Sequence, residues 1–146
     1  MKKKIIGIII ILLVLIQFIQ PEKNQSKDYT NDISTEINIP QNVQQIIKTS
    51  CADCHSNYTV YPWYNNIAPV SWFLANHVNE GKEHLNFSEW TTYNTRQKNH
   101  IIKELKEVIK EKEMPLTSYT LIHKDAILTE QQNTALLDWL NSIKKY

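Results

Sequence analysis

The residues Cys51-Ala52-Asp53-Cys54-His55 form the most specific pattern in this 146-residue chain, and they contain its only two cysteines. Two thiols three residues apart lie on one helical turn, so each can reach one of the vinyl groups on adjacent rings of a haem. The next residue then projects its imidazole toward the iron. This C-x-x-C-H spacing is typical of covalent haem attachment. It predicts one haem c, with thioethers at Cys51 and Cys54 and with His55 as an iron ligand.

The cysteine pair has two alternative uses. A thiol–disulfide centre usually lies between a strand and the helix of a βαβ unit, and the sequence shows no such unit. A structural zinc site needs four ligands, usually from paired motifs, and Cys51, Cys54, His55 and one distant histidine do not supply that spacing. Covalent haem is therefore favoured over both.

Outward from the motif, the apolar residues repeat with helical periodicity, and no alternating run is long enough for a strand. The clearest stripe contains Ile101, Leu105 and Val108. Thr129 and Gln132 match a capping box, Ser71 suits an N-cap, and Gly81 suits a helix end. We expect an all-α fold with long loops near 56–70 and 115–128. The expected helices cover residues 41–49, 71–80, 95–112 and 130–144.

The N-terminus has three lysines in residues 1–4 and no charge in residues 5–21. At 1.5 Å per residue the uncharged stretch spans about 26 Å, close to the thickness of a bilayer core. It lacks a small-x-small cleavage site, so we expect an uncleaved single-pass anchor over residues 1–21. Residues 22–39 would be a polar linker, and 40–146 a haem domain outside the cytoplasmic membrane.

Composition excludes two classes of function. Two glycines in the whole chain are too few for the usual phosphate-binding loops, so no nucleotide is expected. A net charge of +1 is far from the basic balance of nucleic-acid binding proteins. The expected partners are redox proteins of unknown identity.

The distal side of the iron has two candidate ligands. Met114 is the only methionine besides the initiator, and it precedes Pro115 at a predicted helix end, where small cytochromes place a thioether ligand. His77, on the second predicted helix, is the rival. On the other side of the haem, the second ring nitrogen of His55 should donate to a backbone carbonyl, for which Pro62 and Pro69 are candidates.

The chain is rich in aromatic residues for a domain of this size. Tyr and Trp rings can pack on a porphyrin while their O–H or N–H groups meet a propionate. About half of the larger aromatic side chains should therefore line the haem pocket, with the rest in the core. Trp63, Tyr64 and Trp72, which follow the motif, are the predicted pocket residues.

Several segments together resemble the bacterial haem-binding domain family, whose members are small monohaem proteins similar to cytochrome c. The resemblance covers about residues 40–146, and the Tyr61-Pro62-Trp63-Tyr64 run makes it specific. It implies a cytochrome c-like domain with haem on Cys51 and Cys54 and iron on His55 and Met114. The other matching segments are Pro69-Val70-Ser71-Trp72, His77-Val78-Asn79-Glu80-Gly81, Asn86-Phe87-Ser88-Glu89-Trp90 and Met114-Pro115-Leu116-Thr117-Ser118-Tyr119.

The expected function is that of a membrane-tethered electron carrier and not an enzyme, because two protein ligands leave no open position on the iron. A haem-based sensor or small-ligand-binding module is the alternative, if Met114 dissociates. An accessory domain of a peroxidase is a third interpretation. The only arginine, Arg96, offers no distal His/Arg pair in recognisable spacing, which disfavours the peroxidase.

Overall fold

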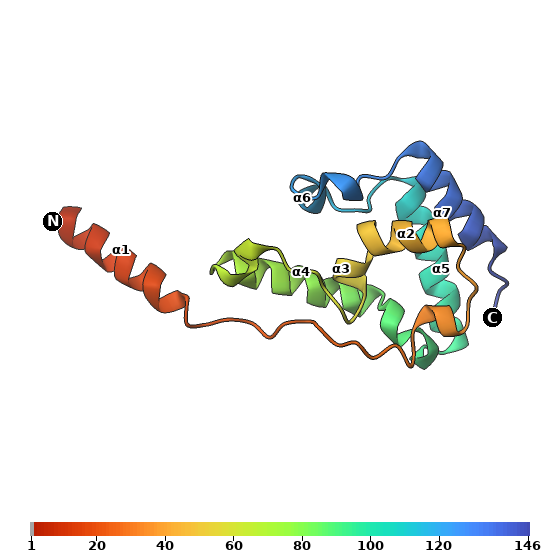
Figure 1. Ribbon diagram of the computed structural model, residues 1–146, viewed down its shortest axis with the longest axis horizontal. Coiled ribbons are helices and arrows are strands. Elements are labelled where there is room, and N and C mark those ends of the chain that lie inside the picture. Colours follow the sequence, from red (N-terminus) through yellow and green to blue (C-terminus); the bar gives the residue numbers. More distant parts are fainter. Residues whose placement is uncertain (1) are drawn as a thin grey trace.

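The computed structural model describes residues 2–146, and within that range the chain is all-α, with an isolated bridge in place of any strand. Figure 1 shows α2, α5 and α7 gathered at one end, α4 extending from them, and α1 standing apart. The α-helices are α1 (Lys2–Ile16), α2 (Gln41–Ser50), α3 (Ala52–His55), α4 (Val70–His84), α5 (Thr95–Lys110), α6 (Thr117–Thr120) and α7 (Glu130–Ser142). Short 3-10 turns are η1 (Ile33–Thr35), η2 (Trp63–Asn66), η3 (Phe87–Thr92) and η4 (Lys124–Ala126).

The core lies where α2, α5 and α7 pack together. Each of these helices is amphipathic and turns its apolar stripe inward. Val43 of α2, Ile101 of α5 and Leu140 of α7 are all buried there, beside Trp139. Burial of these stripes is what holds the three helices together, because apolar area removed from water is the main favourable contribution to folding.

The four predicted helices of the domain are confirmed, with ends that differ from the predicted bounds by up to four residues. The Thr129–Gln132 capping box at the start of α7 is present. Helix α4 begins at Val70, one residue before the predicted cap Ser71. It also continues past Gly81 to His84, so this glycine lies inside the helix and does not end it.

The predicted membrane anchor is wrong. Helix α1 has only 15 residues and includes three lysines. A helix of that length rises about 22 Å, less than the roughly 30 Å of a bilayer core. No helix in the described chain combines the length and the apolar character required to cross a membrane. This finding contradicts the predicted single-pass topology, and with it the predicted localisation in the cytoplasmic membrane.

Residues 22–39, for which the sequence predicts a polar linker, lie along the domain. The bound stretch starts at Gln17, whose side chain donates to the carbonyl of Ala68 at 3.0 Å and accepts from its amide at 2.9 Å. Further on, the Thr59 amide donates to the Asn24 carbonyl at 2.9 Å. The chain therefore covers the loop that follows the cysteine motif (Figure 1).

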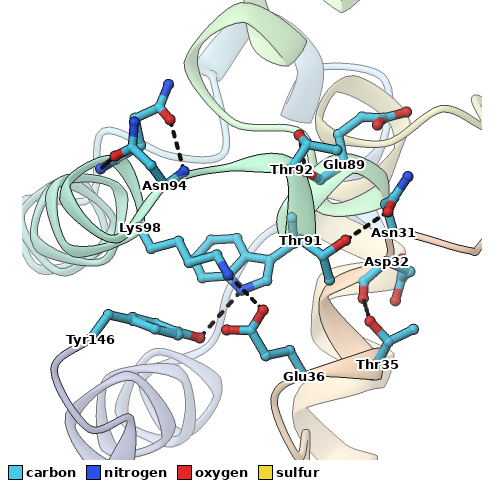
Figure 2. A network of polar contacts seen from close by, with 12 residues as sticks. Asn31, Asp32, Thr35, Glu36, Glu89, Thr91, Thr92, Asn94, Lys98 and Tyr146 are labelled. Atoms are coloured by element: carbon cyan, nitrogen blue, oxygen red, sulfur yellow. Dashed lines mark hydrogen bonds and ion pairs between the residues drawn. The ribbon is translucent and has the colours of Figure 1, made fainter.

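The end of the same segment joins the core through a buried cation. The ammonium of Lys98, on α5, lies 2.6 Å from the Glu36 carboxylate and 4.9 Å from the centre of the Tyr146 ring. Figure 2 shows Lys98 reaching between Glu36 and Tyr146. Lys98 is only 7% exposed, so its charge depends on these two partners and on the Trp90 ring at 5.9 Å. Through Lys98, α5 thus contacts both Glu36, which precedes the first domain helix, and Tyr146 at the C-terminus.

A close backbone approach joins α3 to α4. A Cβ atom at Gly81 would lie 2.7 Å from the backbone oxygen of Cys54 and 3.0 Å from its Cβ. Only glycine permits this distance, because the nearest atom belongs to the backbone and cannot rotate away. Gly81 thus allows α4 to pack directly against the backbone of the cysteine motif.

The Glu36–Lys98 pair predicts a pH-dependent stability. The hydrogen bond from Lys98 lowers the pKa of Glu36 below its ordinary value of 4.5, against the opposing effect of partial burial. A lowered pKa in the folded state stabilises the protein above about pH 4.5, and this stabilisation is lost as the pH falls through the lowered value. Glu36→Gln should therefore lower the free energy of unfolding by about 1–2 kcal/mol at pH 7, and by much less at pH 3.

Denaturant titrations at the two pH values measure this difference. Glu107→Gln is the matched control, because its partner Lys103 is 3.7 Å away and both side chains are more than half exposed. This variant should unfold like the unaltered protein. Equal losses for Glu36→Gln at pH 3 and pH 7 would contradict the assigned role of the Glu36 charge.

Gly81→Ala should destabilise the protein, although glycine-to-alanine changes within helices usually stabilise by about 0.5–1 kcal/mol. The new methyl group meets the Cys54 backbone, so α3 and α4 must separate, at a cost of about 1–3 kcal/mol. Thermal or denaturant unfolding checks the sign. Gly7→Ala in α1, with no atom within 4 Å of the added Cβ, should show no loss.

Candidate haem site

The cysteine motif lies at the junction of α2 and α3. Cys51 closes the last turn of α2, and its carbonyl then accepts from the amides of Cys54 at 3.2 Å and His55 at 3.0 Å. The chain makes a single helical turn over these residues, as their spacing predicts. Cys51, Cys54 and His55 all line one cavity.

This cavity has a volume of about 730 Å³, within the range of sites for small molecules and cofactors. It lies between the motif, α4, α5 and the segment that carries Met114. The apolar residues Leu85, Phe87, Ile101, Leu105 and Leu136 contribute to its wall. Space, apolar walls and a set of thiol and imidazole groups thus occur together, so the site fits a haem.

The orientation of His55 is fixed by a backbone carbonyl. Its Nδ1 lies 3.0 Å from the oxygen of Leu85, which can only accept, so Nδ1 must carry the proton. The carbonyl therefore comes from Leu85 at the end of α4, and neither Pro62 nor Pro69 supplies it. With Nδ1 protonated, Nε2 keeps its lone pair. Burial lowers the pKa of His55, which favours this neutral form.

The two thiols are held in their protonated form. Burial raises the pKa of Cys51 to about 12, with a smaller contribution from neighbouring Cys54. Burial, followed by the charge of Asp53, raises the pKa of Cys54 to about 11. Both cysteines are free of a disulfide. Each thiol thus retains its hydrogen at neutral pH in the folded chain.

Both candidate distal ligands border the cavity. Met114 lies just beyond the end of α5, on the segment leading to α6. His77 lines the cavity from α4, where its Nδ1 lies 3.0 Å from the Phe73 carbonyl and its ring packs on the Phe73 ring at 4.1 Å. Nδ1 of His77 is thus occupied by a backbone carbonyl, as Nδ1 of His55 is, and the choice between Met114 and His77 stays open.

The three aromatic residues expected in the pocket are not among those that line the cavity. Trp63 is 78% exposed. Trp72 donates its indole N–H to the carbonyl of Ile19 at 2.7 Å. Tyr64 is directed toward His123, with 3.3 Å between Oη and Nε2. Trp72 thus contacts the N-terminal segment, and Tyr64 contacts the chain after α6.

Two other aromatic residues take their place at the cavity. Phe87 packs edge-on against the ring of His55, with 6.5 Å between centroids. Tyr119 enters the wall from α6. Phe87 was missed as a site residue because nothing in its local sequence shows which side of the chain faces the motif. Gly81 carried a usable signal, since glycine inside an apolar helix often marks a close approach.

Comparison with known proteins agrees with this chemistry. The family model for the haem-binding domain matches residues 11–142. No curated protein and no solved structure matches the chain. The matched range includes the cysteine motif, the cavity walls and the segment that precedes residue 40. Because the match spans most of the sequence, this chain belongs to the haem-binding domain family.

Proposed function

We propose that the protein holds one haem of type c covalently and acts as an electron carrier with a cytochrome c-like haem domain. The observation that carries the proposal is the common position of Cys51, Cys54 and His55 at one apolar cavity. In attachment, each thiol would add across one vinyl double bond, with sulfur bonding to one carbon and the thiol hydrogen moving to the other. Two thiols three residues apart on one helical turn, both free of a disulfide and on one cavity wall, suit that addition.

His55 would hold the iron from the proximal side through Nε2. The hydrogen bond to Leu85 supports this role, because it fixes the ring and leaves that nitrogen as the only acceptor. The bound haem would supply one-electron chemistry at the iron. The protein would contribute the apolar surroundings and the axial ligands, which together set the reduction potential.

We propose Met114 as the distal ligand, with His77 as the alternative. A thioether is uncharged and favours ferrous iron, so it raises the potential relative to a second imidazole. Two protein ligands would leave no position for a substrate, which supports electron transfer over catalysis. Arg96, the only arginine, is absent from the residues around the cavity, and this disfavours a peroxidase. Redox proteins of unknown identity would be the partners.

Covalent attachment predicts that protein matured with a haem-attachment system keeps its haem through denaturation and acid–organic extraction. Cys51→Ala and Cys54→Ala should each leave at most one thioether, because each removes one sulfur. Absorption of the extracted polypeptide and its intact mass provide the measurement. Complete release of haem from the unaltered protein would exclude covalent attachment while leaving non-covalent binding.

Met114 ligation predicts a weak long-wavelength charge-transfer band in the oxidised protein, which arises from sulfur bound to ferric low-spin iron. Met114→Ala should abolish this band, lower the reduction potential, and open the iron to carbon monoxide after reduction. His77→Ala is the matched comparison and should leave the band in place.

The opposite pattern would identify a bis-histidine iron. In that case His77→Ala removes the low-spin spectrum and Met114→Ala leaves it intact. Rapid binding of carbon monoxide by the unaltered reduced protein would instead favour a ligand-binding or sensor function, because it shows that the distal ligand dissociates easily.

A further inference from the structure

Asp53, inside the cysteine motif, accepts hydrogen bonds from two different parts of the chain. Its Oδ2 accepts from the hydroxyl of Tyr119 at 2.7 Å, and its Oδ1 accepts from the amide of Val60 at 2.9 Å. Its backbone carbonyl accepts from the Thr59 hydroxyl at 2.6 Å. The loop after the motif thus fixes the Asp53 side chain, and one carboxylate oxygen is directed toward α6.

Tyr119 is the residue of α6 that meets this carboxylate, and it also lines the cavity. Burial, followed by the hydrogen bond to Asp53, raises the pKa of Tyr119, so its hydroxyl remains a donor at any ordinary pH. The ring stacks on that of His123, with centroids 4.2 Å apart and planes at 11°. The hydroxyl and the ring are therefore both held in place.

The distal segment, residues 114–123, makes few other hydrogen bonds to the rest of the protein. Within the described chain, its hydrogen bonds to distant elements are the one that Tyr119 donates to Asp53 and the one between Tyr64 and His123, the latter at 3.3 Å. The remaining ones are local bonds around α6. A hydrogen bond to a carboxylate is stronger than one between neutral groups. The Tyr119–Asp53 bond is thus the main polar contact of the distal segment with the motif.

We infer that Asp53 and Tyr119 are positioning residues that hold the distal segment over the haem cavity and so limit the access of external ligands to the iron. The inference rests on the proposed haem site; its imidazole measurement applies with Met114 as the distal ligand, whereas its hydrogen-exchange measurement does not depend on the identity of that ligand. It follows from geometry: the same residue lies between the attachment cysteines and bonds to the wall that carries Met114. When Asp53 is held in the cysteine motif, its bond to Tyr119 therefore also holds residues 114–123 beside the cavity.

The test uses the haem-loaded full chain and its Tyr119→Phe variant, which keeps the ring and removes only the hydroxyl. Imidazole should bind the ferric iron of the variant about tenfold more tightly, because loss of one hydrogen bond to a charged group raises the open population by about that factor. Amide hydrogen exchange in residues 114–123, followed by mass spectrometry, should accelerate by a similar factor.

Tyr61→Phe is the matched control, because its hydroxyl accepts from the Asn24 amide at 3.0 Å and lies outside the cavity wall. It should change neither imidazole binding nor exchange in the distal segment. Asp53→Asn keeps one oxygen as an acceptor, so its effect should fall between those of Tyr119→Phe and the unaltered protein.

Two results would overturn the inference. One is a Tyr119→Phe variant whose imidazole affinity and segment exchange equal those of the unaltered protein. The other is an equal increase in Tyr61→Phe, which would show a general loss of stability. Failure of the proposed function is recognised separately, since the unaltered protein would then lack the absorption of bound haem. Exchange in the distal segment would still decide whether the Tyr119 hydroxyl holds it.

Discussion

The contact between Gly81 and the backbone of Cys54 determines how the site is built. At this point α4 approaches the cysteine motif more closely than any side chain would allow. One turn later, α4 ends and the carbonyl of Leu85 reaches Nδ1 of His55. The packing of two helices therefore sets the direction of an imidazole. Because Nδ1 is already bonded, Nε2 is the ring nitrogen that remains for another partner, on a residue that lines the cavity.

Local signals predicted the four domain helices, because apolar periodicity and the Thr129 cap act within a few residues. A helix end that is set by contacts with residues far along the chain could not be predicted from such local patterns. Helix α1 ends where Gln17 bonds to Ala68, 51 residues along the chain, and an apolar composition carries no information about that bond. The uncharged run continues to Pro21, beyond the end of the helix at Ile16.

In the candidate haem site, too, residues defined by local spacing could be predicted, whereas those brought in by distant contacts could not. Cys51, Cys54 and His55 could be predicted to share one site because their chemistry needs a fixed local spacing, and all three line the same cavity. Met114 stays a prediction for the distal position, with His77 as its rival. The partner carbonyl of Leu85 could not be predicted, since any backbone oxygen has the same chemistry. Aromatic content predicted rings near the cavity but not their direction. The rings found there are Phe87 and Tyr119, whereas Trp63 is directed into solvent.

The bound N-terminal segment changes where the smallest independently folding unit begins. Ile33, Ile37 and Ile39 are buried members of the core, although they precede the first domain helix. The Asn24 side chain donates to the Ser56 carbonyl and accepts from the Lys82 ammonium, each at 2.8 Å. A fragment cut at residue 40 would expose apolar surface and leave the loop after the motif without its backbone partners. Fusion proteins and domain transplants built on this chain should therefore be joined ahead of residue 17.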